Sequence, residues 1–168
     1  MRKFSSILLV LLLAVSFWNC EKDDICADGN ANSPFMVVEF YDASNPTVLK
    51  NVTNLGVGDP TFNKRFSFTG ISKIEVPLRR NDSTTTLNFI KNGGDVLDTS
   101  DDNPDSVTFN YQTNDVYVSR ACGYKTVFQL NDTNPVEFIP DANSWIQNIV
   151  VTQPNIFNEN EVHIKIYF

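Results

Sequence analysis

Residues able to carry out catalysis are few in this chain. His163 is the only imidazole, and it has no sequence partner of the kind that a general base or a metal centre requires. No nucleophile elbow, phosphate-binding glycine loop, zinc-protease helix or paired C-x-x-C motif occurs in the sequence. We therefore expect a protein that is not an enzyme and that needs no cofactor.

Five aspartates crowd into one interval between two predicted strands. Asp101, Asn103 and Asp105 have the D-x-N-x-D spacing that opens a calcium loop. Ser106, however, stands where the turn glycine of such a loop belongs, and Gln112 replaces the closing glutamate. A solvated acidic loop is the favoured interpretation, and a weak calcium site is the alternative.

Trp145 is a candidate glycan contact. Asn143, Ser144, Gln147 and Asn148 surround it in the sequence, and saccharide sites combine an exposed aromatic face with amide side chains. A tryptophan that opens an apolar strand more often belongs to the core. We favour the core interpretation and keep the glycan contact as the alternative.

Two serines are candidates for O-glycosylation. Ser83 lies in an Asp-Ser-Thr tripeptide and Ser106 in an Asp-Ser-Val tripeptide. Both resemble the short acceptor pattern of exported bacterial glycoproteins. The pattern is brief, and chance matches are common.

The N-terminus predicts export and lipidation. Residues 1–19 begin with Arg2 and Lys3 and continue with an apolar stretch too short to span a bilayer, as in a signal peptide. A lone Cys20 directly after such a stretch resembles the cleaved and acylated residue of bacterial lipoproteins. Residues 20–33 would then form a lipidated tether. Removal of residues 1–19 changes the net charge from −7 to −9, a sign that excludes electrostatic binding of nucleic acid.

The two other cysteines, Cys26 and Cys122, form an even pair. Outside the inner membrane thiols are oxidised, so the pair predicts one disulfide. In the chain-entropy model, the loop closed by this bond would stabilise the folded state by roughly 4 to 5 kcal/mol. Two separate buried thiols are the alternative, because two cysteines carry no spacing signature.

The composition predicts an all-β fold for residues 34–168. After residue 19 the chain has 38 Val, Ile and Thr residues but only 11 Ala and Leu residues. The C-terminal segment also alternates, which predicts a strand with Ile164 facing inward and His163 facing solvent. Nine or ten short strands indicate a single antiparallel β-sandwich, immunoglobulin-like or related, with a small closed barrel as the alternative. We predict strands over residues 35–41, 48–52, 73–78, 85–90, 107–111, 115–121, 124–130, 136–139, 145–152 and 162–168.

Three segments resemble a family of small Bacteroidetes outer-membrane lipoproteins with no assigned function. They are residues 20–26 (CEKDDIC), residues 40–42 (FYD) with Asn45-Pro46, and residues 116–124 (VYVSRACGY). The resemblance spans residues 20–168 and implies an outer-membrane lipoprotein with an uncharacterised domain. It transfers no catalytic or binding residue.

Together these features predict a lipid-anchored outer-membrane protein. We expect it to face the cell exterior, with a periplasm-facing orientation as the alternative, because residues 22–24 resemble a surface-export tag. Its expected role is a non-enzymatic binding or accessory subunit for a protein or polysaccharide partner. A structural or assembly component of an envelope complex is the second hypothesis. A small carboxylate hydrolase using Glu39 with Asp42 is the third.

Overall fold

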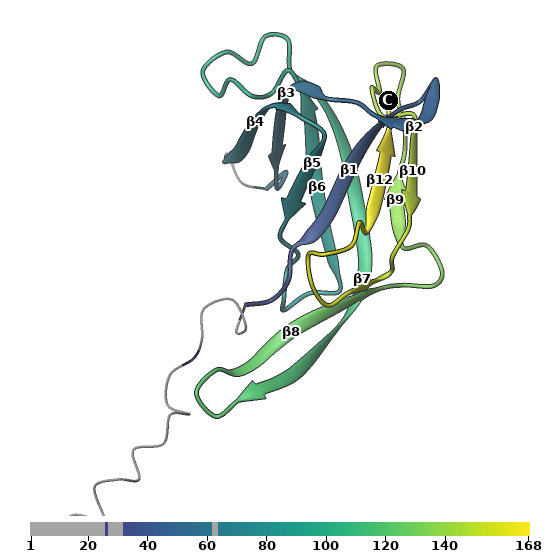
Figure 1. Cartoon of the computed structure of the whole chain (residues 1–168). Helices are drawn as coiled ribbons and strands as arrows, with labels where there is room; N and C mark the ends of the chain where they lie inside the picture. Colours follow the sequence, from purple (N-terminus) through teal and green to yellow (C-terminus); the bar gives the residue numbers. More distant parts are fainter. Residues whose placement is uncertain (1–25, 27–31, 62–63) are drawn as a thin grey trace, which may run out of the picture. The chain divides into compact units, whose positions relative to one another are not determined.

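The computed structural model describes Cys26, residues 32–61 and residues 64–168 (Figure 1). The chain divides into two compact units, which are treated separately below. The hairpin unit comprises Met1–Asn32 and Tyr117–Lys125, and the sandwich unit comprises Ser33–Val116 and Thr126–Phe168. The predicted signal peptide, Cys20 and most of the tether lie outside the described residues.

The described residues form β-strands and no helix. None of them lies in a helix able to cross a membrane. The strands are β1 (Met36–Asp42), β2 (Asn45–Leu49), β3 (Val52–Gly58), β4 (Arg65–Ile71), β5 (Lys73–Val76), β6 (Thr84–Lys91), β7 (Asn103–Ser119), β8 (Gly123–Leu130), β9 (Val136–Phe138), β10 (Asn148–Val151), β11 (Asn155–Ile156) and β12 (Ile164–Tyr167).

One sheet has five strands in the order β10-β12-β1-β2, and β5 also pairs with β1. β1 is its central strand, and Met36, Val37, Val38 and Phe40 are fully buried there. β1 and β12 run parallel, whereas the other pairs in this sheet are antiparallel (Figure 1). The expected antiparallel order therefore has one exception, at the pair that joins the first strand to the last.

The other sheet has seven strands in the order β11-β8-β7-β6-β3-β4, and β9 also pairs with β7. β6 and β7 pair over eight successive positions, from Thr84 opposite Asn110 to Lys91 opposite Asn103. Along β6 buried and partly exposed side chains alternate, so that one face points into the protein and the other toward solvent. β4 lies at one end of this sheet and pairs only with β3 among the described strands.

The two sheets pack together around one apolar core. Phe40 of β1 contacts Phe89 of β6 edge to face, with ring centroids 6.4 Å apart, so the core joins the two sheets directly. The strands separate into two packed sheets, as expected of the predicted β-sandwich.

Three predicted strands, at residues 48–52, 107–111 and 115–121, differ from the observed ones for physical reasons. Residues 48–52 were expected to form one strand, but β2 ends at Leu49 and β3 begins at Val52, in different sheets. Residues 107–111 and 115–121 were expected as two strands, but the 17-residue β7 runs without a break through both, from Asn103 to Ser119. The polar residues between them are compatible with an extended strand because both faces of that part of β7 are exposed.

Candidate functional site

His163 is not on the solvent-facing side of a strand, so that prediction is wrong. Its ring is buried, and its Nδ1 accepts a hydrogen bond from the backbone amide of Val37 at 2.9 Å. The amide of His163 in turn donates to the carbonyl of Val37 at 3.0 Å. Burial lowers the pKa of His163 below its usual 6.5, although Glu161 and Glu159 oppose the shift. His163 is a structural residue that joins β1 to the segment before β12.

Trp145 cannot serve as a sugar-stacking platform, because only 6% of it is exposed. Its indole packs edge to face on Phe168 with ring centroids 5.3 Å apart and lies close to Phe40. Its Nε1 donates a hydrogen bond to the carbonyl oxygen of Phe89 at 3.1 Å. The glycan-contact hypothesis for Trp145 is wrong, and the core interpretation is correct.

The calcium-loop hypothesis for Asp101, Asn103 and Asp105 is also wrong. Asp105 is buried inside β7, where its Oδ2 accepts hydrogen bonds from the amides of Trp145 and Ile146 at 2.9 and 2.8 Å. The Asn103 side-chain amide donates to a backbone carbonyl 40 residues away. Among the described residues no cluster of three His, Cys, Asp or Glu side chains is suited to a metal.

Glu39 and Asp42, the carboxylates of the hydrolase hypothesis, have separate partners. Glu39 accepts a hydrogen bond from the hydroxyl of Tyr41 at 2.8 Å, and this bond raises the pKa of Tyr41. Asp42 accepts from the amide of Ser44 at 2.9 Å and lies 3.8 Å from the ammonium of Lys50. Each carboxylate therefore has a local structural partner.

Ser83 and Ser106 are both exposed, so their hydroxyls are accessible from solvent. Ser83 lies in the turn before β6, and its carbonyl accepts a hydrogen bond from the amide of Tyr111. Ser106 lies in β7 and its hydroxyl donates to the side chain of Asn88. Glycosylation of either serine stays a prediction.

Cys26 and Cys122 form the predicted disulfide, with their Cα atoms 4.9 Å apart. Cys122 lies at the turn between β7 and β8, where its amide donates to the hydroxyl of Ser119 at 3.0 Å. Gly123 follows with a φ of 70°, a conformation that glycine adopts without steric cost. The bond ties the N-terminal segment to this turn, within the hairpin unit.

The most ligand-like feature of the sandwich unit is a cavity that we call the inner cleft. It has a volume of about 360 Å³, near the lower end of the range for small-molecule pockets. It opens between β5 of one sheet and the β4, β3 and β6 end of the other. Its lining residues are Val57, Gly58, Asp59, Lys64, Phe66, Phe68, Glu75, Val76, Pro77, Leu78, Arg79, Thr85 and Leu87.

The walls of the inner cleft are apolar side chains that the two sheets do not cover fully. Phe66 and Phe68 lie two residues apart on β4, opposite Val57 and Leu55 of β3, and thus share the inner face of the sheet. Phe68 packs against the core, whereas 65% of Phe66 is exposed. The cleft therefore offers a large aromatic surface to a ligand without any rearrangement of the core.

Polar groups near the inner cleft are mostly paired with each other. Arg79 forms ion pairs with Asp59 and Asp82. Hydrogen bonds from Thr61, together with Arg79, hold the pKa of Asp59 at about 2. Asp59 is therefore ionised at neutral pH and has no proton to donate as a catalytic acid.

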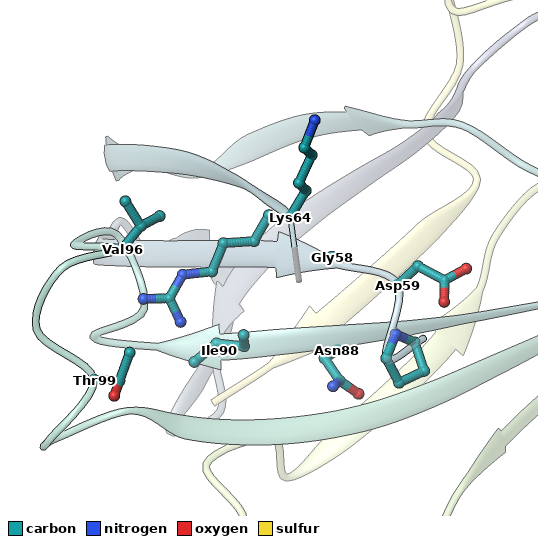
Figure 2. A pocket seen from close by; sticks show the side chains of 9 residues that line it. Gly58, Asp59, Lys64, Asn88, Ile90, Val96 and Thr99 are labelled. Atoms are coloured by element: carbon teal, nitrogen blue, oxygen red, sulfur yellow. The ribbon is translucent and has the colours of Figure 1, made fainter. Parts of the chain in front are cut away.

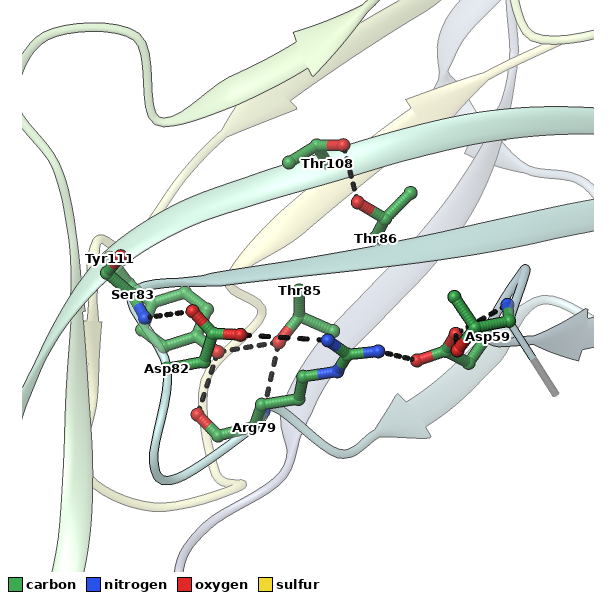
Figure 3. Close-up of polar contacts among 9 residues, drawn as sticks. Asp59, Arg79, Asp82, Ser83, Thr85, Thr86, Thr108 and Tyr111 are labelled. Atoms are coloured by element: carbon green, nitrogen blue, oxygen red, sulfur yellow. Dashed lines mark hydrogen bonds and ion pairs between the residues drawn. The ribbon is translucent and has the colours of Figure 1, made fainter.

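A ring of three hydrogen bonds fixes the backbone of Arg79 (Figure 3). The hydroxyl of Tyr111 donates to the Arg79 carbonyl at 2.8 Å, and the Arg79 amide donates to the hydroxyl of Thr85 at 2.9 Å. The two hydroxyls lie 2.6 Å apart, which requires that Thr85 donates to Tyr111. This part of the cleft rim is therefore held in place before any ligand binds.

Within residues 32–61 and 64–168, the inner cleft has two rim charges without an ion pair and one strand edge without a neighbouring strand. Lys64 and Glu75 form no ion pair there, so one charge of each sign is available at the rim. β4 also has a sheet edge that no described strand covers. An uncovered strand edge presents a row of backbone donors and acceptors, which is the template for adding a further strand.

A second cavity, the outer cleft, lies on the opposite face of the same strands and has a volume of about 470 Å³. Figure 2 shows Gly58, Asn88 and Ile90 along its strands, with Val96 and Thr99 supplied by a neighbouring loop. The guanidinium of Arg65 binds Asp102 and the carbonyl of Asp95. Arg65 is therefore already paired, and no phenylalanine is among the described residues that line the outer cleft, so the inner cleft is the better candidate for an apolar ligand.

The sequence prediction missed β4, the strand that supplies Phe66 and Phe68. The signal was present, because these two phenylalanines alternate with Ser67 and Thr69 as in a half-buried strand. Alternation cannot reveal that the inner face of β4 is left uncovered, since this depends on the limited extent of the opposite sheet. The cleft was therefore beyond prediction even with the strand identified.

Residues 51–168 match the model of the family described as "Family of unknown function (DUF6452)". The chain belongs to this family. No curated protein and no solved structure matches the chain. The matched DUF6452 region contains the inner cleft and Cys122 but not Cys20 or Cys26. It agrees with the expected uncharacterised domain and does not bear on the lipoprotein part of the resemblance.

Proposed function

We propose that the protein is a lipid-anchored, non-enzymatic binding subunit of the outer membrane, facing the cell exterior. Its inner cleft would hold an extended segment of a protein partner, which adds a strand to the uncovered edge of β4. One large apolar side chain of that segment would enter the cleft.

The observation that carries this proposal is Phe66, exposed in an apolar cavity beside an uncovered strand edge. Backbone pairing at a strand edge provides affinity, and a pocket for a side chain provides specificity. Lys64 and Glu75 at the rim suit polar residues on either side of the apolar one. A polysaccharide is less suited, because Asp59, Arg79 and Thr85 already use their polar groups within the protein.

The anchor is supported by the sequence around Cys20, an apolar stretch followed by a lone cysteine. Acyl chains attached there would hold the domain at a membrane through burial of CH₂ groups, and more than one chain is needed for stable attachment. A Cys20→Ala variant should leave the membrane fraction. A Cys20→Ala chain that stays membrane-bound would refute the anchor.

The cleft is tested by photo-cross-linking in intact cells, with the photoreactive residue at position 66. The matched control is position 157, because Phe157 is also exposed, at 51%, and follows β11 at the opposite end of the same sheet. We expect one discrete protein adduct at position 66, at least tenfold stronger than at position 157. Equal yields at the two positions, or an adduct that disappears on polysaccharide digestion, would contradict the proposal.

A second measurement tests the strand addition itself. Once the adduct identifies the partner, amide hydrogen exchange of Arg65–Ile71 should slow when the partner is added, because new backbone hydrogen bonds protect the amides. Phe66→Ser should weaken partner binding at least tenfold, whereas Phe157→Ser should leave it unchanged. Binding without protection of β4 would show that the partner contacts another surface.

A further inference from the structure

The end of the β7–β8 hairpin carries a pair of exposed tyrosines. Tyr117 and Tyr124 are 54% and 67% exposed, and their rings meet edge to face with centroids 5.4 Å apart. We call residues 117–125 the tyrosine tip. Such a pair of exposed amphipathic rings on two strands joined by one turn is typical of a binding surface.

The charge of the tyrosine tip opposes that of the whole chain. Residues 117–125 contain Arg120 and Lys125 and no Asp or Glu, whereas the full chain has a net charge of −7. Tyrosine with neighbouring Arg and Lys is the composition that proteins place at the headgroup level of membranes. A phosphate-bearing surface therefore fits the tip in both its aromatic and its charged parts.

The disulfide limits how far the tyrosine tip can lie from the predicted lipid anchor. Cys122 in the tip is bonded to Cys26, and Cys26 follows Cys20 by six residues. Six residues span at most about 20 Å when fully extended. An acyl group on Cys20 would therefore keep the tip within a short distance of the bilayer surface.

We propose that the tyrosine tip docks into the phosphate-bearing headgroup layer of the membrane that holds the protein. This inference rests on the anchor in the proposed function and adds a second contact, which would orient the protein on the membrane. The predicted tether carries Glu21, Asp23, Asp24 and Asp28 against Lys22, so Arg120 and Lys125 of the tip offset most, but not all, of its negative charge. The tyrosines then supply most of the contact.

Fluorescence quenching tests this proposal with the full lipidated chain in phosphatidylethanolamine–phosphatidylglycerol vesicles that contain a headgroup-level quencher lipid. Tyr124→Trp places a reporter in the tip, and the wild-type chain with its buried Trp145 supplies the background. Leu97→Trp is the matched control, because Leu97 is 93% exposed and precedes β7, whereas the tip begins in the last residues of β7. We expect quenching at position 124 to exceed quenching at position 97 at least threefold.

A double variant tests whether the disulfide to the tether is needed for docking of the tip. Cys26→Ser with Cys122→Ser keeps both tyrosines but removes the disulfide, so quenching of the Tyr124→Trp reporter should fall at least twofold. Retention of full quenching in this background would contradict the role of the disulfide in holding the tip at the surface.

The outcomes distinguish this inference from the anchor. Equal quenching at positions 124 and 97, in a chain that still floats with the vesicles, overturns tip docking and leaves the anchor intact. Intact mass without acyl groups, together with a chain that does not float, overturns the anchor and the docking that rests on it. Quenching at position 124 alone supports both.

Discussion

The closed part of the core and the inner cleft differ in which side chains they leave accessible to solvent. In the core, His163, Asp105 and Trp145 carry the polar atoms that first suggest chemistry, and each is buried with hydrogen-bond partners. In the inner cleft, Phe66 is chemically inert but exposed. The residues with reactive atoms are structural, and the apolar residue is the one available to a ligand.

The physical reason for this difference lies in the cost of burial. A buried polar group without a partner destabilises the protein, so a buried imidazole, carboxylate or indole must bind a neighbour and is thereby occupied. An exposed phenylalanine costs the fold little but exposes apolar surface that a ligand can cover. Substitutions at four positions test this contrast.

Trp145→Ala should have the largest effect on stability. It removes an indole that packs on Phe40 and Phe168 and leaves the Phe89 carbonyl without its hydrogen bond. We expect a loss of about 3–5 kcal/mol in the free energy of unfolding, measured by urea titration. Leu97→Ala is the control and should change stability by less than about 0.5 kcal/mol. A loss below about 1 kcal/mol for Trp145→Ala would show that the indole is not part of the core.

Asp105→Ala should be the next most damaging change, because it leaves two buried amides, those of Trp145 and Ile146, without an acceptor. We expect a loss of about 2–4 kcal/mol, since an unpartnered buried donor costs about 1–3 kcal/mol. Asp105→Asn retains one acceptor oxygen and should lose clearly less in the same titration. Equal losses for the two variants would argue against the hydrogen bonds as the cause.

His163 should make stability depend on pH in the range above the carboxylate titrations. Its folded pKa is lowered, so below pH 6.5 the unfolded chain takes up the proton more readily than the folded chain. Stability is therefore complete above pH 6.5 and falls as the pH drops from 6.5 toward the folded pKa. His163→Asn, which cannot titrate and still has an acceptor oxygen, should show a flatter profile between pH 7.5 and 5. An unchanged profile would mean that another group causes the dependence.

Phe66→Ser should have the smallest effect on stability, less than about 0.5 kcal/mol by urea titration, because the ring is already mostly exposed. Its effect on partner binding should be large, as stated for the proposed function. A loss of more than about 2 kcal/mol would place Phe66 in the core and remove the contrast between the two regions.

The fold was predictable from local patterns, because alternation and β-branched residues report directly on half-buried strands. Strand 107–111 is an example, since Val107, Phe109 and Tyr111 are all buried in β7. The disulfide was predictable by counting cysteines. The burial of His163 was not predictable. Alternation places His163 on the same face as Lys165, but His163 precedes β12, and its ring accepts a hydrogen bond from Val37, 126 residues away.

The candidate site was less accessible to sequence reasoning than the fold. The role of Asp105 depends on two amides 40 and 41 residues later in the chain, and no local spacing reports such a contact. The same holds for the inner cleft. It lies between β5 and β4, and the sequence of either strand alone does not predict the space between them. Long-range packing, rather than residue type, decides which groups are occupied and which remain accessible.

The parallel pairing of β1 with β12 has a consequence for the order of events during biosynthesis. β1 is the central strand of its sheet, yet its partner on one side, Ile164–Tyr167, comes after all the other described strands in the sequence. Contacts of such high sequence separation form slowly. The nascent chain must therefore keep the four buried apolar residues of β1 out of wrong pairings until β12 has been synthesised.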